Sequence, residues 1–156
     1  MNRSVLACLL VLTVGAFGMK VEAASEWETD FSKAAANAKK SGLYMLLDFS
    51  GSDWCGWCMK LEKEVFSKAE FKKYAREYLV CVLVDFPKQK KLSKKLSDQN
   101  SELAQKYDIK GYPSIIILAP DGSLVDQTGY QEGGAQKYVE YLKKTIDMHK
   151  QKQTGK

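Results

Sequence analysis

Hydrophobic positions occur along the chain in blocks that are typical of alternating helices and buried strands. Three apolar runs predict strands that are buried on both faces, at residues 43–49, 79–85 and 114–118. The turn signal Pro120-Asp121-Gly122-Ser123 predicts a hairpin that leads into a fourth strand at residues 124–128. Apolar residues at helical spacing and helix-forming composition predict helices at residues 29–41, 55–65, 69–78, 102–107 and 136–149.

The order of these segments predicts an α/β domain. Helices alternate with buried strands, which requires a central sheet with helices on both of its faces. The hairpin adds an antiparallel pair at the end of the sheet. The polar tail at residues 150–156 is expected to fray.

The first residues have the pattern of a secretory signal peptide. Arg3 precedes a nearly apolar run at residues 5–18, and Val21-Glu22-Ala23 supplies small residues for cleavage after Ala23. A membrane span needs about 20 apolar residues, so an uncleaved anchor is the weaker alternative. We therefore expect a signal peptide at residues 1–23, a single domain at 24–156, and a periplasmic or secreted protein.

The motif Trp54-Cys55-Gly56-Trp57-Cys58 points to the chemistry of this domain. At a helix N-terminus, Cys55 is expected to be exposed and close to unpaired N–H groups, which together with the helix dipole favour its thiolate. Cys58 follows one helical turn later, where it can resolve a mixed disulfide. The motif therefore predicts reversible dithiol–disulfide chemistry.

A metal site or a haem attachment site is the main alternative for two cysteines at this spacing. The remaining candidate ligands, Cys8, Cys81 and His149, do not complete a convincing set, and Met59 stands where haem attachment needs a histidine. Metal binding by two thiolates in a dimer is a weaker option. We expect no metal and no cofactor besides a redox-active disulfide, and we expect Cys81 to be a buried core residue.

The charge of the chain gives little indication of its partners. The formal net charge of +5 is a mild basic excess, which does not indicate binding to nucleic acid. A cluster of lysines is either a solvated loop or short helix, or a patch that steers acidic partners. Its members are Lys88, Lys90, Lys91, Lys94 and Lys95.

The chain resembles the thioredoxin superfamily over most of residues 24–156. The resemblance rests on Asp48-Phe49, the two-cysteine motif, Gly111-Tyr112-Pro113 and Gly129. It implies a thioredoxin fold, in which helices flank a central mixed β-sheet, here with an extra N-terminal helix. With the predicted signal peptide, the chain is similar to exported Dsb-type thiol–disulfide oxidoreductases, which reduce or isomerise protein disulfides.

The resemblance also implies roles for individual residues. Cys55 is the attacking thiol, Cys58 is the resolving thiol, and the two form the redox-active disulfide. Pro113 is the cis-proline that faces the dithiol, and the backbone of Tyr112 pairs with an extended substrate peptide. Asp48 is a buried carboxylate that relays a proton to and from Cys58.

The relay role of Asp48 has a physical basis, because burial raises a carboxyl pKa toward neutrality. The alternative is a residue that ends a strand and bonds locally. Trp54 and Trp57 flank the dithiol and could form an apolar docking surface for substrates, although Trp54 could equally pack against its own loop.

The motif interior is Gly-Trp, whereas common thioredoxins have Gly-Pro. A tryptophan supplies no cation that would push the Cys55 thiol to the very low pKa of a strong oxidant. We therefore expect a reductase or isomerase, with a dithiol oxidase or a non-catalytic thioredoxin-fold binding module as alternatives. The expected partners of this monomer are cysteine-containing exported proteins and a reducing partner, a membrane electron carrier.

Overall fold

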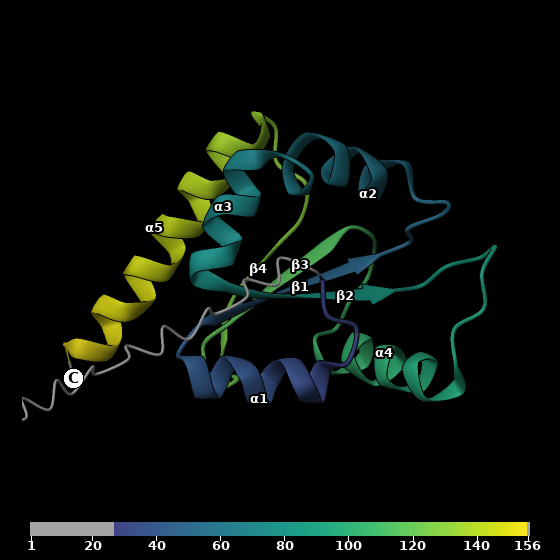
Figure 1. Cartoon of the computed structure of the whole chain (residues 1–156), viewed down its shortest axis with the longest axis horizontal. Coiled ribbons are helices and arrows are strands. Elements are labelled where there is room, and N and C mark those ends of the chain that lie inside the picture. Colours follow the sequence, from purple (N-terminus) through teal and green to yellow (C-terminus); the bar gives the residue numbers. More distant parts are fainter. Residues whose placement is uncertain (1–26, 156) are drawn as a thin grey trace, which may run out of the picture.

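The computed structural model describes residues 27–155 of the chain as a mixed four-stranded sheet between two layers of helices (Figure 1). The strand order is β2-β1-β3-β4, with β1 parallel to β2 and antiparallel to β3, and with β3 antiparallel to β4. The strands are β1 (Tyr44–Ser50), β2 (Leu79–Asp85), β3 (Ser114–Leu118) and β4 (Leu124–Thr128). The predicted signal peptide lies outside the described residues.

Each face of the sheet is covered by its own set of helices (Figure 1). One face packs against α1 (Phe31–Ser41) and α4 (Lys94–Lys106). The other face packs against α2 (Gly56–Leu61), the π-helical turn η1 (Glu62–Phe66), α3 (Ala69–Tyr78) and α5 (Gly134–Thr154). The mixed sheet, its flanking helices and the helix before the first strand confirm the predicted fold class.

The side chains of β1 point alternately to the two faces of the sheet, and this alternation determines which helical layer each side chain contacts. All seven residues of β1 are buried. Met45, Leu47 and Phe49 join the core beneath α1 and α4, whereas Tyr44 and Leu46 join the core beneath α3 and α5. Because successive side chains of a strand point to opposite faces, Asp48 lies on the same face as Leu46, toward the layer that contains α2.

The helix α4 is much longer than the predicted helix at residues 102–107. It begins after Ser93, whose hydroxyl accepts the Leu96 N–H at 3.3 Å as an N-cap. Burial of Leu103 and Asn100 holds the helix against the sheet. Lys94 and Lys95 therefore lie in its first turn, and the other lysines of the basic cluster remain in the preceding loop.

The C-terminal helix also differs from its prediction. The tail expected to fray from Lys150 onward is helical as far as Thr154. The hydroxyl of Thr154 donates to the Lys150 carbonyl at 3.3 Å, and His149 contacts the Tyr44 hydroxyl at 2.9 Å. The first bond is internal to the helix, and the contact of His149 with Tyr44 attaches the last turns of α5 to the start of β1.

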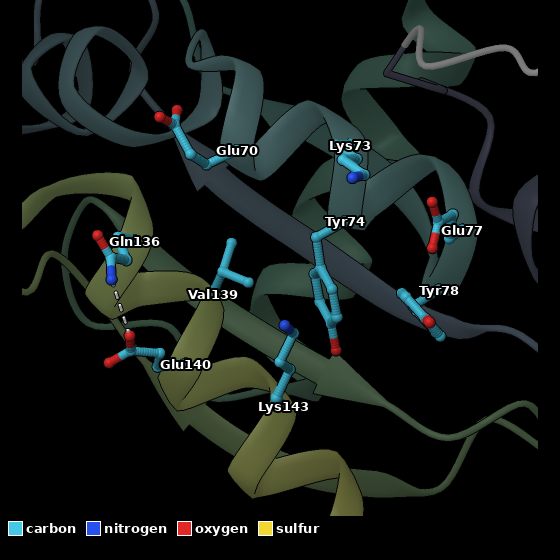
Figure 2. Close-up of a pocket in the computed structure, with 9 residues that line it drawn as sticks. All are labelled: Glu70, Lys73, Tyr74, Glu77, Tyr78, Gln136, Val139, Glu140 and Lys143. Carbon is cyan, nitrogen blue, oxygen red and sulfur yellow. Dashed lines mark hydrogen bonds between the residues drawn. The ribbon is translucent and has the colours of Figure 1, made fainter.

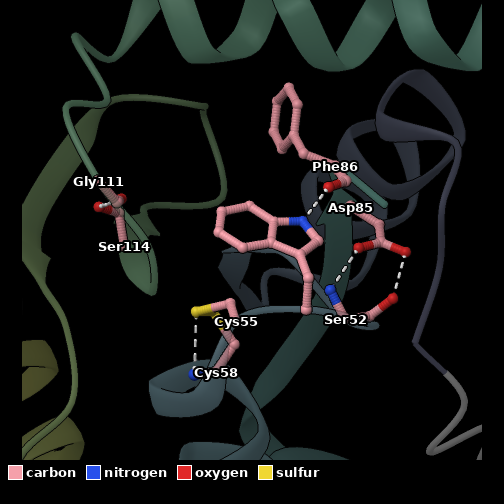
Figure 3. The surroundings of a disulfide bond; sticks show 8 residues. Ser52, Cys55, Cys58, Asp85, Phe86, Gly111 and Ser114 are labelled. Carbon is pink, nitrogen blue, oxygen red and sulfur yellow. Dashed lines mark hydrogen bonds between the residues drawn. A yellow bond between two sulfur atoms is a disulfide. The ribbon is translucent and has the colours of Figure 1, made fainter. Parts of the chain in front are cut away.

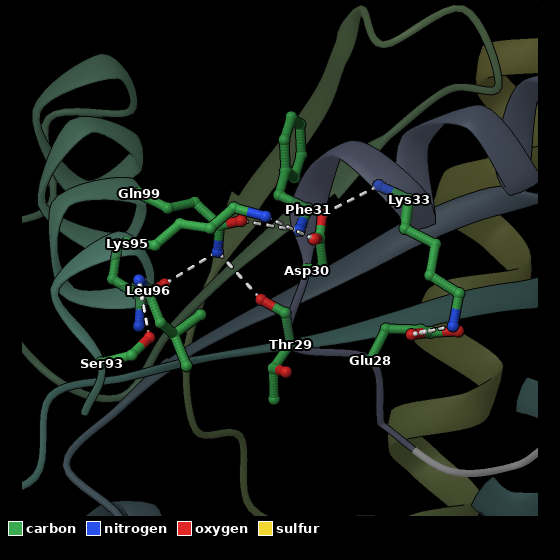
Figure 4. A network of polar contacts seen from close by, with 10 residues as sticks. Glu28, Thr29, Asp30, Phe31, Lys33, Ser93, Lys95, Leu96 and Gln99 are labelled. Atoms are coloured by element: carbon green, nitrogen blue, oxygen red, sulfur yellow. Dashed lines mark hydrogen bonds and ion pairs between the residues drawn. The ribbon is translucent and has the colours of Figure 1, made fainter. Parts of the chain in front are cut away.

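Polar contacts fix the start of α1 against α4 (Figure 4). The Asp30 carboxylate caps α1 by accepting the Lys33 N–H at 3.0 Å. The Gln99 side chain accepts from the Phe31 N–H and donates to the Thr29 carbonyl, both at 2.9 Å. The two helices on this face are therefore joined by hydrogen bonds as well as by the core.

None of the helices within residues 27–155 is long and apolar enough to cross a membrane.

Candidate active site

A disulfide between Cys55 and Cys58 lies where the loop after β1 enters α2 (Figure 3). Cys55 is the N-cap of the helix, and its sulfur accepts the Cys58 N–H at 3.2 Å. The same N–H can stabilise a thiolate on Cys55 once the disulfide is reduced. The two Cα atoms are 5.2 Å apart.

Both cysteines are largely covered by the surrounding chain. The exposed fraction is 6% for Cys55 and 4% for Cys58, so the prediction of an exposed Cys55 is wrong. The loop turns tightly at this point, since the N–H groups of Trp54 and Cys55 both donate to the Gly51 carbonyl. This turn draws Cys55 back against the domain and leaves a narrow approach to its sulfur.

Asp48 is a buried carboxyl without a hydrogen-bond partner for its Oδ1 atom within residues 27–155. Burial raises its pKa to about 8, and the nearby charges of Glu62 and Asp85 add to the shift. A residue that ended the strand by bonding locally would have its oxygen atoms satisfied. Asp48 therefore lacks, at Oδ1, the local hydrogen bond that this alternative expects.

Glu62 is a second carboxyl of this site, and the sequence analysis missed it. It opens the π-helical turn that follows α2 and keeps contact with solvent. Partial burial of its carboxyl raises its pKa above the usual range, while the charge of Lys72 acts in the opposite direction. The spacing of four residues from Cys58 was an available signal, since such pairs are neighbours on a helix.

Trp54 forms one wall of the site and also packs against its own loop. Its indole N–H donates to the Phe86 carbonyl at 2.8 Å, and the edge of its ring meets Tyr112 with centroids 5.9 Å apart. Gly51 makes room for this ring, because an added Cβ would lie 2.4 Å from the indole. With 37% of the residue exposed, Trp54 packs against its own loop and also presents part of its ring to solvent.

Trp57 forms a second aromatic wall and is 57% exposed. Its ring lies 5.2 Å from that of Tyr130, and the Lys60 ammonium lies 4.9 Å from the centroids of both rings. The Tyr130 hydroxyl donates to Glu64 at 2.6 Å, which holds this ring in place. An exposed indole with a fixed neighbour is suited to docking apolar parts of a partner.

The loop before β3 carries Tyr112 and Pro113, which are joined by a cis peptide bond. Gly129, at the end of β4, approaches this loop so closely that an added Cβ would lie 3.0 Å from the Pro113 carbonyl oxygen. The Tyr112 ring packs against Phe86 with centroids 5.2 Å apart. The structure thus brings Tyr112 next to Trp54, although they are far apart in sequence.

A buried carboxylate at the end of β2 anchors the loop that carries the motif (Figure 3). Asp85 accepts the Ser52 N–H at 2.9 Å and the Ser52 hydroxyl at 2.7 Å. Its charge is paired with Lys90 at 3.0 Å, and its backbone carbonyl accepts from Asn100 at 2.9 Å. No sequence motif indicated this network, because its members come from four separate segments.

Other candidate features lie outside this site. Cys81 is only partly buried on β2, although burial of its thiol raises the pKa to about 12. A hollow of about 510 Å³ between α3 and α5 is lined by Tyr74, Tyr78 and charged residues, without a cysteine (Figure 2). Within residues 27–155, no group of three or more His, Cys, Asp or Glu side chains is arranged to hold a metal ion.

Residues 31–146 match the thioredoxin-like domain family. The chain therefore belongs to this family. With the Cys55–Cys58 disulfide, it is a thioredoxin-like thiol–disulfide oxidoreductase.

Its similarity to individual proteins extends over most of the domain. The chain is 30% identical to the disulfide bond reductase DsbH of Chlamydia pneumoniae, over 79% of this chain and 74% of that protein. The solved structure of a DsbH oxidoreductase superposes with a TM-score of 0.75 at 30% identity, covering 78% of this chain and 84% of that one. A Thermus thermophilus thioredoxin, at 17% identity, has a TM-score of 0.59 and covers 78% and 86% of the two chains, which shows the shared fold.

Proposed function

We propose that this protein is an exported reductase of protein disulfides. One observation carries the proposal: a Cys55–Cys58 disulfide caps a helix on the sheet face that also holds a buried carboxyl, Asp48, without a partner for its Oδ1. Such a site can carry out reversible dithiol–disulfide exchange, and the Asp48 carboxyl can hold and release the proton that the exchange needs. The similarity to a disulfide bond reductase supports the same direction of electron flow.

The reaction proceeds by two thiol–disulfide exchanges. The Cys55 thiolate attacks one sulfur of a substrate disulfide, which forms a mixed disulfide and releases the first substrate thiolate. Cys58 then loses its proton and attacks Cys55, which forms the Cys55–Cys58 disulfide and releases the second substrate thiolate. The substrate gains two electrons, and the dithiol loses two.

Asp48 supplies the proton transfer that the second exchange needs. In its ionised form the carboxylate accepts the Cys58 proton, and in the recharging direction the protonated carboxyl returns it. A pKa of about 8 makes both forms accessible close to neutral pH. Glu62 connects this buried site to solvent, because it is exposed and its charge acts on Asp48.

The charges around the site favour a reductant over an oxidant. A strong oxidant stabilises its reduced form through an unusually stable thiolate. Here the charges of Glu62 and Asp85 raise the pKa of the buried Asp48 carboxyl, which indicates a negative potential on this face of the sheet, and a negative potential opposes a thiolate. The Gly-Trp interior of the motif adds no compensating cation.

The predicted signal peptide supports a location outside the cytosol, in a periplasm or among secreted proteins, where disulfides form and persist. Its substrates there are cysteine-containing exported proteins. A reductase in an oxidising compartment must be recharged, and a membrane electron carrier is the reducing partner. We infer that an extended substrate approaches Cys55 past the exposed rings of Trp57 and Trp54 and pairs with the backbone of Tyr112, beside Pro113. Isomerisation of non-native disulfides is a further reaction that the same dithiol can carry out.

Substitution of the two cysteines tests their division of labour. We expect Cys55→Ser to abolish disulfide reduction, because the attacking thiol is lost. We expect Cys58→Ser to accumulate mixed disulfides, because the first exchange still occurs and the resolving thiol is missing. Non-reducing gels of protein incubated with oxidised insulin measure the trapped species, and equal trapping by both variants would contradict the assignment.

Substitution of Asp48 tests the proton relay. In the native protein the carboxylate fraction rises with pH through about 8, so the resolving step should accelerate between about pH 6 and 9. We expect Asp48→Asn to slow turnover and remove this acceleration, and Glu62→Gln to shift it to lower pH. Stopped-flow kinetics measure the profile, with the exposed Glu102→Gln on α4 as control. Unchanged rates for Asp48→Asn across this range would make the residue structural.

The reduction potential tests the direction of electron flow. We expect a value nearer to the about −270 mV of thioredoxin than to the about −120 mV of the oxidant DsbA, because the surrounding charges do not stabilise a thiolate. Equilibration with glutathione buffers, followed through the fluorescence of Trp54 and Trp57, gives the value. A potential above about −150 mV would reverse the assignment to an oxidase.

A further inference from the structure

The loop between β2 and α4 presents a basic surface beside the dithiol. We call residues 86–92 the basic loop; its lysines are all exposed. A hollow of about 400 Å³ opens along it, and its lining includes Lys88, Lys90, Lys91, Ser97 and Asn100. The position of this hollow, at the end of β2, places it next to the loop that carries the cysteine motif.

Hydrogen bonds hold the basic loop against the end of β1 and against the loop that carries the cysteine motif. The Asp53 carboxylate accepts the N–H groups of Lys88 at 2.9 Å and Gln89 at 2.8 Å. The Phe86 N–H donates to the Ser50 carbonyl at 2.8 Å, and its carbonyl accepts from the Trp54 indole. The backbone of the basic loop therefore has a fixed position relative to the loop that leads into Cys55.

The positive charge of the basic loop is only partly compensated. Lys90 is paired with Asp85, and the two lysines at the start of α4 are paired with Asp98 and Asp30. Lys88 and Lys91 form no ion pair within residues 27–155. Hydrogen bonds from the backbone lower the pKa of Asp53, so that carboxylate stays charged while its oxygens face the N–H groups of the loop.

Lys88 brings the positive charge of the basic loop next to Trp54, which forms one aromatic wall of the site. Its ammonium lies 3.9 Å from the centroid of the Trp54 ring, whose edge meets Tyr112. A partner that contacts the exposed part of the Trp54 ring therefore also meets the Lys88 ammonium. The surface combines an apolar ring with an unpaired cation, which suits a peptide segment with acidic side chains.

We propose that the basic loop docks an acidic stretch of a partner protein, located next to the cysteines that react with Cys55. This inference rests on the proposed function and names the chemistry of its partner. A nucleic acid fits less well, because affinity for its backbone comes from many phosphates that are neutralised by Lys and Arg. Lys88 and Lys91 supply two unpaired cations within one short loop.

Binding to redox-inert peptides tests the docking without any chemistry. The probes are three dye-labelled peptides of one sequence, with serine in place of cysteine and with Glu, Gln or Lys at the same flanking positions. We expect the Glu peptide to bind the oxidised protein about fivefold to tenfold more tightly than the Gln peptide at low salt, the scale of two exposed ion pairs. The preference should vanish at 1 M salt, where the Debye length is about 3 Å. Fluorescence anisotropy measures each affinity.

Two double variants test whether Lys88 and Lys91 cause the preference for the Glu peptide. The double variant Lys88→Gln, Lys91→Gln should lose the preference for the Glu peptide. The control Lys39→Gln, Lys40→Gln removes the same charge from the last turn of α1, outside the basic loop, and should keep the preference. Equal affinity for the Glu and Gln peptides, or equal loss of the preference in both double variants, overturns the proposal.

A disulfide-containing version of the Glu and Gln peptides separates this proposal from the proposed function. Faster reduction of the Glu peptide, measured as kcat/KM, supports the docking. Equal kcat/KM for both peptides overturns the docking and leaves the reductase assignment intact. If the inert Glu peptide binds selectively but neither disulfide peptide is reduced, the docking of acidic peptides by the basic loop is supported. The same result overturns the assignment as a reductase.

Discussion

The burial of one carboxyl group in the central strand is the constraint on which the site depends. Every residue of β1 is buried, and Asp48 occupies a position that the strand alternation assigns to the core. An ionised carboxylate is unfavourable in such a place, so the pKa rises until the group is protonated over much of the neutral range. Burial of this carboxyl carries a cost to stability, which is consistent with a role in proton transfer.

The polar network around the dithiol separates negative from positive charge. The Asp85 carboxylate holds Ser52 in the loop that leads to the cysteines and, together with Glu62, raises the pKa of the buried Asp48 carboxyl. Lysines lie at the rim, where Lys60 and Lys88 contact the exposed aromatic rings. Negative charge close to the sulfurs opposes a thiolate, whereas positive charge at the rim acts on approaching partners. We propose that this arrangement of charge influences both the direction of the reaction and the kind of partner that binds.

Much of this fold follows from local sequence patterns. The four strands and the helix that carries Cys55 and Cys58 were predictable, because each depends on apolar runs or turn signals within a short segment. The start of α4 was missed because its N-cap, Ser93, lies within a run of lysines that suggested a loop. The Asp85–Ser52 bonds and the coupling of Glu62 to Asp48 could not be predicted, since they join residues that only the folded sheet brings together. The low exposure of Cys55 likewise follows from the turn at Gly51.

The central claim is that the fold holds the Asp48 carboxyl in an apolar setting close to the dithiol. Its most direct test is a titration of the Asp48 side-chain carbon by 13C NMR in the oxidised protein, assigned with Asp48→Asn. We predict a midpoint near pH 8, raised chiefly by burial. A midpoint near the ordinary aspartate value of about 3.9 would show that the carboxyl is solvated, and it would contradict the account.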